Sequence, residues 1–458
     1  MYTVLALVQR SCSSTDQIRS CPQATPEWQG SLILPFLGSL ITGQPFNSSE
    51  PYTPPGANSS TTVPAPGPDE SEDCLFLDIA VPESVLTNAG QGFGAPVLVW
   101  IYGGGYTIGS KTNNPAGLLA ASGNSSNGEV IYVSLNYRLG AFGFQAGPSF
   151  NAEGGVSNVG LYDQRFALEW VQKYIHLFGG DKNRVTVFGE SAGGGSIMHQ
   201  ITAYGGTKGK VPFQQAIPQS PELRTMPSED LIRANAQQVT YESSWGQYTY
   251  GPVVDGSFVP LQPGQLLAQG KFDQDVSVMA GHNADEGAFF TPPYVRSDET
   301  LESHLKTIFP AAPQQTFDYI TKTLYPPVFD GSLPYRDQYS RAALIVSEAI
   351  FTCNTNYLMT ASGNMSYSYL FAVPPALHGQ DVSYTYYTGG APSDIALGAS
   401  NLTIANALQQ FITSFAKEGR PSADGIRPFN MYGQDASVLR LNVTDIDEIR
   451  DKQGKLKR

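Results

Sequence analysis

A serine between two glycines, in the segment Gly189-Glu-Ser191-Ala-Gly193, is the residue of this sequence best suited to nucleophilic chemistry. Residues 185–188 are apolar or β-branched and predict a buried strand that leads into the segment. A strand that reverses sharply into a helix brings backbone atoms into contact, and Gly189 and Gly193 allow this because they lack a Cβ. Such a turn exposes the serine hydroxyl at the top of a sheet, beside the N-terminus of the next helix. The pattern predicts a nucleophile elbow with Ser191 as the nucleophile.

The serine needs a base, because a hydroxyl is a poor nucleophile until a neighbouring group takes its proton. In hydrolases with this kind of elbow, the acid and then the histidine follow the serine along the chain. His378 fits this order, since it follows a predicted strand, lies in a loop and precedes Gly379. The other four histidines fit less well: His176 precedes the serine, His199 lies on a predicted helix, His282 precedes the acid candidates, and His304 lies in a helical pattern and is expected at the surface.

The acid of the triad must lie at the end of a strand between the serine and the histidine. Asp285 and Glu286 both meet this condition, because they follow the predicted strand 275–280. Asp255, in Gly251-Pro-Val-Val-Asp-Gly256, is more typical of a turn. The residues alone do not separate Asp285 from Glu286.

The elements around these residues alternate between strands and helices, which is typical of an α/β fold. Continuous apolar runs of strand length predict strands buried on both faces, and therefore a mainly parallel sheet. Gly103, Gly104 and Gly105 follow one such run, so their backbone N–H groups can approach a ligand closely. The predicted strands are 72–81, 97–102, 130–135, 215–220, 275–280, 367–371 and 438–441; the predicted helices are 161–178 and 403–418, with 299–350 mainly helical.

The composition of the 458 residues narrows the class of protein. With 41% hydrophobic and 15% charged residues the chain is globular, and its net charge of −13 argues against nucleic acid or an anionic membrane as a partner. No apolar run reaches the length of a transmembrane helix, and the start of the chain lacks the basic region of a signal peptide. The four cysteines have no zinc-ligand spacing and there are only five histidines, so a metal site is not expected.

Glycosylation sequons favour a secreted, glycosylated protein. They stand at Asn47, Asn58, Asn124, Asn364, Asn401 and Asn442. Residues 40–71 are rich in Pro, Gly, Ser and Thr and predict a long surface loop, which Cys21 and Cys74 bracket.

With these residues placed, the chain resembles the type-B carboxylesterase/lipase family, the cholinesterase-like α/β-hydrolases, and most of all the fungal secreted members. The resemblance extends from about Cys21 to about Tyr432. The segments that carry it are Ser71-Glu-Asp-Cys-Leu75, Trp100-Ile-Tyr-Gly-Gly-Gly-Tyr106, Leu135-Asn-Tyr-Arg-Leu139, Asn158-Val-Gly-Leu-Tyr-Asp-Gln164, Phe178-Gly-Gly-Asp181, Gly189-Glu-Ser-Ala-Gly-Gly194, Asn283-Ala-Asp-Glu-Gly287 and Ala376-Leu-His-Gly-Gln-Asp381.

The resemblance implies an α/β-hydrolase fold, with a mainly parallel central sheet, helices on both faces and helical insertions around an active-site gorge. It implies one domain over residues 21–445, with residues 1–20 as an incomplete N-terminal remnant and 446–458 as a polar tail. It also implies that Glu286 is the acid, that Cys21 pairs with Cys74, and that the oxyanion is bound by the N–H groups of Gly104, Gly105 and Ala192.

The chain departs from the family pattern at three places. The signal peptide and small β-structure with which family members begin are not recognised before Cys21. Family members usually carry some tens of additional residues between Pro221 and Leu223. The cysteine near the C-terminus that usually pairs with the counterpart of Cys353 is missing, which leaves Cys353 and Cys12 outside the expected disulfide.

The expected function is hydrolysis of carboxylic esters through a serine acyl-enzyme, with a small-molecule or lipid ester as substrate and no cofactor. An alternative from another class is a non-catalytic binding or adhesion protein on the same fold. A third alternative, a triacylglycerol lipase, differs only in substrate and needs a mobile lid, for which the loop between Cys21 and Cys74 is the candidate. We expect the protein to be secreted.

Overall fold

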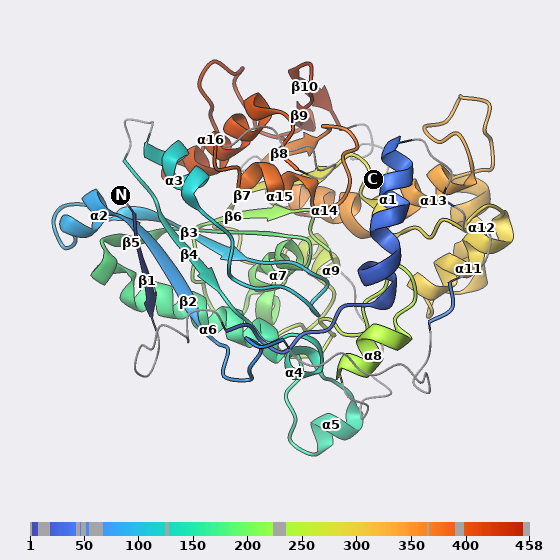
Figure 1. Ribbon diagram of the computed structural model, residues 1–458, viewed down its shortest axis with the longest axis horizontal. Helices are drawn as coiled ribbons and strands as arrows, with labels where there is room; N and C mark the ends of the chain where they lie inside the picture. Colours follow the sequence, from blue (N-terminus) through green and yellow to red (C-terminus); the bar gives the residue numbers. More distant parts are fainter. Residues whose placement is uncertain are drawn as a thin grey trace.

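The computed structural model describes residues 2–7, 19–42, 46, 52–54, 67–123, 128–222, 235–363, 366–389 and 398–451. In these residues one ten-stranded sheet forms the centre of the molecule (Figure 1). In spatial order its strands are β1 (Tyr2–Leu7), β2 (Leu77–Pro82), β4 (Ile131–Leu135), β3 (Ala95–Ile101), β5 (Gly180–Glu190), β6 (Gln215–Gln219), β7 (Ser277–Asn283), β8 (Ser366–Phe371), β9 (Ser437–Leu441) and β10 (Ile446–Arg450).

The strands from β4 to β9 are paired in parallel, and antiparallel pairs occur only towards the two edges of this sheet. β2 runs antiparallel to β4 and to β1, and β10 runs antiparallel to β9. Parallel neighbours have their carboxyl ends at the same edge, so β5, β6, β7 and β8 deliver the loops that follow them to one place. The predicted α/β fold with a mainly parallel sheet is confirmed.

Helices cover both faces of the sheet. α6 (Val159–Tyr174) and α7 (Ala192–Ile201) lie on one side, and α3 (Ala116–Gly123) and α16 (Leu402–Glu418) lie on the other (Figure 1). The predicted apolar stripe of α16 is buried, with Ile404, Leu408, Phe411, Ile412 and Phe415 all at most 2% exposed. Removing side chains of this size from water contributes about 1.5–3 kcal/mol each, so the stripe fixes the helix on the sheet.

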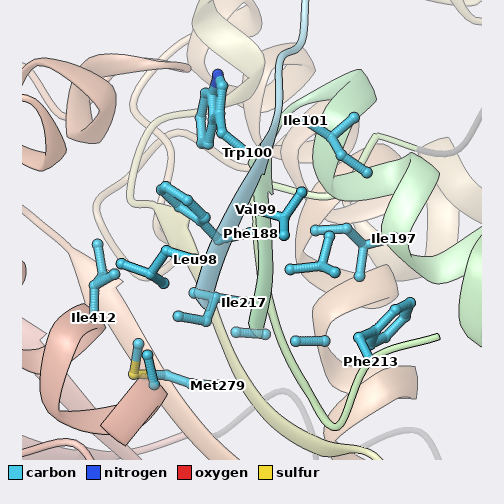
Figure 2. Close-up of a cluster of buried hydrophobic side chains, with 14 of the residues drawn as sticks. Leu98, Val99, Trp100, Ile101, Phe188, Ile197, Phe213, Ile217, Met279 and Ile412 are labelled. Atoms are coloured by element: carbon cyan, nitrogen blue, oxygen red, sulfur yellow. The ribbon is translucent and has the colours of Figure 1, made fainter. Parts of the chain in front are cut away.

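The alternation of side chains along β3 divides the core between the two faces. Figure 2 shows Leu98 on the side of Ile412 from α16, and Val99 and Ile101 on the side of Ile197 from α7. Each of these side chains is fully buried. Successive residues of a strand point to opposite faces, which is why a strand covered on both sides is a continuous apolar run.

A separate group of helices lies beyond the carboxyl ends of the strands, at the right of Figure 1. α1 (Ile33–Thr42) packs beside α13 (Gln338–Ser347), where the rings of Phe36 and Tyr339 have their centroids 5.6 Å apart. The group also contains η2 (Trp28–Leu32), α8 (Asn235–Glu242), α10 (Gly287–Phe290), α11 (Asp298–Ile308) and α12 (Gln314–Tyr319). The remaining helical segments are α2 (Glu83–Thr87), α4 (Gly140–Phe144), α5 (Pro148–Ala152), η3 (Ile175–Phe178), η4 (Ala203–Gly206), α9 (Pro263–Ala268), η5 (Ile320–Leu324), η6 (Glu348–Thr352), α14 (Cys353–Ala361) and α15 (Gln380–Thr385).

Both edges of the sheet extend beyond the predicted domain of residues 21–445. β1 lies before Cys21, where no small β-structure is recognised in the sequence, and pairs with β2 along its whole length. Residues 446–450, expected in the polar tail, form β10. For β10 the sequence signal is weak, because an edge strand is held by backbone hydrogen bonds on one side and needs few apolar side chains.

Cys21 and Cys74 form the disulfide that the resemblance implies, and both residues are fully buried. Cys353 is half-buried and lies outside this bond, whereas Cys12 lies outside the described residues. Among the sequon asparagines, Asn401 and Asn442 lie in the described part of the chain; Asn47, Asn58, Asn124 and Asn364 lie outside it. In the described part of the chain, no helix has the length and apolar character needed to span a membrane.

Candidate active site

Ser191 occupies the tight turn between β5 and α7. Its backbone angles, φ 56° and ψ −122°, are strained for a residue with a side chain. The turn is closed against β3: a Cβ on Gly189 would lie 2.5 Å from the carbonyl oxygen of Ile101, and one on Gly193 would lie 2.1 Å from the same atom. Glycine is therefore required at both positions, and the predicted elbow is present.

His378 lies in the loop between β8 and α15, with its Nε2 atom 2.8 Å from the Oγ atom of Ser191. The rings of Phe290 and Phe351 lie against the imidazole, with centroid distances of 4.9 Å and 4.6 Å. These rings limit rotation of the imidazole and keep Nε2 directed at the serine.

Glu286 lies on the opposite side of the imidazole and is fully buried. Its Oε2 atom is 2.6 Å from Nδ1 of His378. Its Oε1 atom accepts hydrogen bonds from the hydroxyl of Ser220 at 2.6 Å and from the backbone N–H of Asn283 at 2.5 Å. Asp285, the other acid that the residues alone allow, is exposed. The structure therefore brings Glu286, and not Asp285, to the histidine.

A buried polar network holds this carboxylate from behind. The side-chain amide of Asn283 donates to Oγ of Ser220 and to Oδ1 of Asp381, both at 3.2 Å. Gln219 and Tyr369 also donate to Oδ2 of Asp381, at 3.0 Å and 3.1 Å. These buried hydrogen bonds hold Ser220 and Asn283, the two residues that donate to Glu286, and so help to fix the position of its carboxylate.

The other candidate bases and acids lie elsewhere. Asp255 is the turn residue that its sequence predicts, since its Oδ1 atom accepts from the N–H groups of Ser257 and Val259. The expectation that His304 lies at the surface was wrong: it is 4% exposed, because α11 turns this position towards the interior. Burial lowers the pKa of His199 to about 3 and also lowers that of His282, so both are neutral inside the protein.

The residue just before the serine, Glu190, is a third member of the charged group around the imidazole. Its Oε1 atom is 3.3 Å from Nε2 of His378. Burial raises the pKa of Glu190 to about 8, although the positive charge of His378 opposes the change. Burial also disfavours the charged form of His378, but Glu190, Glu286 and Glu222 outweigh it and raise the pKa to about 9. Burial acts to raise the pKa of Glu286, but the charge of His378 and its hydrogen bond outweigh burial and lower this pKa.

The predicted oxyanion donors lie beside the elbow. Gly104 and Gly105 follow β3 with φ values of 101° and 60°, a region that glycine adopts without cost. Ala192 is the first residue of α7, where the backbone N–H has no partner within the helix. In the described part of the chain, no hydrogen bond to a protein acceptor is found for these three N–H groups. They are available to an anionic oxygen.

Two carboxylates of the site, Glu190 and Glu222, are absent from the sequence prediction. Glu190 could have been found from its place inside the elbow motif, because the residue next to a nucleophile always lies near the site. Glu222 has no motif around it. Only the course of the chain after β6 shows that its Oε2 atom lies 3.2 Å from Oγ of Ser191.

The model of the carboxylesterase family matches residues 15–223 and 221–455 of the chain. The two matched segments meet at 221–223, the position at which the family resemblance leads us to expect additional residues. Together they cover most of the chain.

Named relatives and solved structures agree with this match. The chain is 39% identical to the carboxylesterase patB of Penicillium expansum, over 92% of this chain and 81% of the relative. It is 33% identical to a secreted lipase of Arthroderma benhamiae, over 77% of this chain and 72% of the relative. It is 30% identical to the inactive carboxylesterase-like protein VdtD of Byssochlamys spectabilis, over 60% of this chain and 53% of that protein. The crystal structure of Aspergillus niger EstA is similar in fold, with a TM-score of 0.72, 26% identity, and coverage of 85% of this chain and 84% of that one.

Proposed function

Because the chain belongs to the carboxylesterase family and is a carboxylic-ester hydrolase, we propose that it cleaves its substrate through an acyl-enzyme on Ser191. The observation that carries the proposal is the continuous hydrogen-bonded line from Ser191 through His378 to Glu286, with distances of 2.8 Å and 2.6 Å. A nucleophile, its base and a carboxylate that orients the base are the three groups needed for acyl transfer.

In the acylation step, Oγ of Ser191 attacks the ester carbonyl while Nε2 of His378 takes the hydroxyl proton. Glu286 accepts the hydrogen bond from Nδ1 and stabilises the imidazolium that forms. The oxygen of the tetrahedral intermediate is held by the N–H groups of Gly104, Gly105 and Ala192.

The same groups complete the acylation and then carry out the deacylation. The imidazolium of His378 gives its proton to the departing alcohol, which leaves the acyl group on Ser191. A water molecule then attacks the acyl-enzyme while His378 takes its proton, and His378 returns this proton to Oγ of Ser191 as the bond to the acyl group breaks and the acid is released.

The alternative of a non-catalytic binding protein has one supporting observation, the relative that is named inactive. Here the candidate nucleophile, base and acid all stand within hydrogen-bond distance of one another, which favours catalysis. Measured turnover separates the two possibilities directly.

A lipid ester is the second candidate substrate. Leu34, Leu40 and Ile41 of α1 are 67%, 40% and 39% exposed, and they lie inside the loop that the Cys21–Cys74 disulfide closes. Exposed apolar side chains on a disulfide-bracketed loop are suited to a lipid surface. Hydrolysis of p-nitrophenyl esters of increasing chain length, with and without emulsion, distinguishes a lipase from an esterase.

We also infer that the protein works in an oxidising compartment and is secreted. The buried Cys21–Cys74 disulfide supports this, because such bonds are rare in the cytosol. The similarity to a secreted lipase supports it as well.

The test of the acyl-enzyme is Ser191→Ala, compared with the exposed Ser149→Ala as a matched control. We expect the first variant to lose about 10⁴-fold or more in kcat on p-nitrophenyl acetate, and the control to keep the wild-type value. A serine-directed organophosphonate should add to Ser191 in the wild type, as read by peptide mass. If Ser191→Ala kept a tenth of the activity, Ser191 would not be the nucleophile.

A further inference from the structure

Glu222 places a carboxylate directly against the candidate nucleophile. Its side chain is 2% exposed, and its Oε2 atom accepts a hydrogen bond from Oγ of Ser191 at 3.2 Å. The negative charge of Glu222 contributes to the raised pKa values of His378 and Glu190. Within the proposed mechanism, none of the steps uses this residue.

The position of Glu222 is fixed by its backbone. Its N–H donates to the carbonyl of Ser191 at 3.2 Å, and the side-chain amide of Asn354 on α14 reaches the carbonyl of Pro221, just before it, at 3.4 Å. The chain also lies close on the first turn of α7, where a Cβ on Gly195 would be 2.0 Å from the carbonyl oxygen of Glu222. The carboxylate is therefore held at the elbow by the surrounding main chain.

The serine hydroxyl has a single hydrogen, but two acceptors lie within its reach in the resting site: Nε2 of His378 and Oε2 of Glu222. For attack, this hydrogen must point to Nε2 of His378, the nearer acceptor at 2.8 Å. Oε2 of Glu222 then loses the serine as donor at the moment when the substrate carbonyl arrives at Oγ. Because the carbonyl carbon bonds to Oγ, substituents close to that carbon come within hydrogen-bond reach of the carboxylate.

A carboxylate beside the nucleophile distinguishes substrates by the hydrogen-bonding groups that they carry. It accepts hydrogen bonds and donates none, so a hydroxyl or an ammonium group on the substrate gains a charge-assisted bond. A plain hydrocarbon chain adds no bond of this kind, and an anionic group is repelled. Sites that hydrogen-bond a substrate hydroxyl discriminate more strongly than apolar pockets do.

We propose that Glu222 is a specificity-determining residue that selects esters with a hydroxyl or ammonium group close to the scissile carbonyl. The proposal rests on the acyl-enzyme function of Ser191. The donor can stand on the acid part or on the alcohol part of the ester, and both carry the same chemistry to Glu222.

The experiment compares esters of similar size, each formed from a four-carbon acid and a two-carbon alcohol. Ethyl butyrate is the reference; ethyl 3-hydroxybutyrate and ethyl 4-aminobutyrate carry a donor on the acid part, 2-hydroxyethyl butyrate carries one on the alcohol part, and monoethyl succinate carries an anion. Hydrolysis is followed by titration of the released acid, and kcat/KM is determined for each ester. The variants are Glu222→Gln, which keeps the size and removes the charge, and Glu222→Ala, with the exposed Glu153→Gln as the matched control.

We expect the wild type to prefer at least one donor-bearing ester over ethyl butyrate by about tenfold or more, and to disfavour monoethyl succinate. In Glu222→Ala this preference should fall at least tenfold, and in both variants the penalty on the succinate ester should shrink. Titration with an organophosphonate counts intact sites and corrects for any loss of folded protein. Glu153→Gln should keep the wild-type ratios.

Two results overturn the selection by Glu222. One is a wild type that hydrolyses ethyl butyrate as well as every donor-bearing ester, a result that needs no variant. The other is a Glu222→Ala enzyme whose ratios stay within twofold of the wild type. If the wild type neither reacts with the organophosphonate nor hydrolyses any ester, the acyl-enzyme proposal fails as well, so the two failures can be told apart.

Discussion

Replacing Glu286 by glutamine tests the acid of the triad, because the change keeps the shape and removes the charge. The two shortest hydrogen bonds to Oε1 of Glu286 come from Oγ–H of Ser220 and the backbone N–H of Asn283. In Glu286→Gln the amide oxygen must take this place, since an NH₂ group there would face two other donors. The amide NH₂ is then directed at Nδ1 of His378, which lies 2.6 Å from the other carboxylate oxygen.

The size of the effect follows from the proton on the imidazole. Facing an NH₂ group, Nδ1 of His378 must become an acceptor, and its proton moves to Nε2. Nε2 is then unable to take the proton of Ser191, and no negative charge remains to stabilise the imidazolium. The same carboxylate-to-amide change in a serine protease triad lowers kcat about 10⁴-fold. We expect a loss of that order here, which corresponds to about 5.5 kcal/mol in the activation free energy.

The assay is kcat on p-nitrophenyl acetate at a fixed pH, with circular dichroism and thermal unfolding to confirm the fold. Asp285→Asn is the control, because Asp285 has an exposed side chain and its backbone N–H keeps the bond to the carbonyl of Ala376. It should lose less than tenfold. A Glu286→Gln enzyme with more than about one hundredth of the wild-type kcat, or an Asp285→Asn enzyme that loses as much, would refute the reasoning.

Two further predictions concern the charge around the imidazole and the disulfide. Glu190→Gln removes a negative charge 3.3 Å from Nε2 of His378, so the pKa of the histidine should fall from about 9. Since the base must be neutral, the acidic limb of kcat/KM against pH should move by about one unit or more to lower pH, and an unmoved limb would contradict the assignment. The double change of Cys21 and Cys74 to alanine opens a loop of 53 positions and should lower the free energy of unfolding by about 4 kcal/mol on the chain-entropy model. Urea unfolding measures the loss, and a change below about 1 kcal/mol would show that this loop is held by other contacts.

The elbow and the histidine could be predicted from the sequence because each depends on local chemistry. A Cβ on either glycine beside Ser191 would lie only 2.1 or 2.5 Å from the carbonyl oxygen of Ile101 on β3, so the constraint appears directly as residue types. His378 could be reached by elimination, because only it had the right order and a loop position. The spacing of residues does not separate Asp285 from Glu286, because adjacent side chains differ in the direction in which they point. Only the family resemblance identified Glu286 as the acid.

The edge strand β10 could not be predicted, for a different physical reason. A central strand such as β3 is covered on both faces and must be apolar throughout. β10 has a mixed composition, with Ile446 and Ile449 partly buried and charged residues between them. Its pairing with β9 is made by the backbone, which any such sequence can provide. That residues 446–450 form a strand therefore depends on the neighbouring strand β9 more than on their own residue types.

The carboxylates Glu190 and Glu222 show a further limit of sequence reasoning. Charge is visible in a sequence but burial is not, and a buried carboxylate is costly unless a positive group or hydrogen-bond donors compensate it. At this site both carboxylates lie near His378: burial acts to lower the pKa of the imidazole, but the charges of Glu190, Glu286 and Glu222 outweigh it and raise the pKa. The acid–base behaviour of the histidine is therefore set in part by residues that the triad itself does not include. The pH dependence of kcat/KM is the measurement that reports on Glu190, and the preference among esters is the one that reports on Glu222.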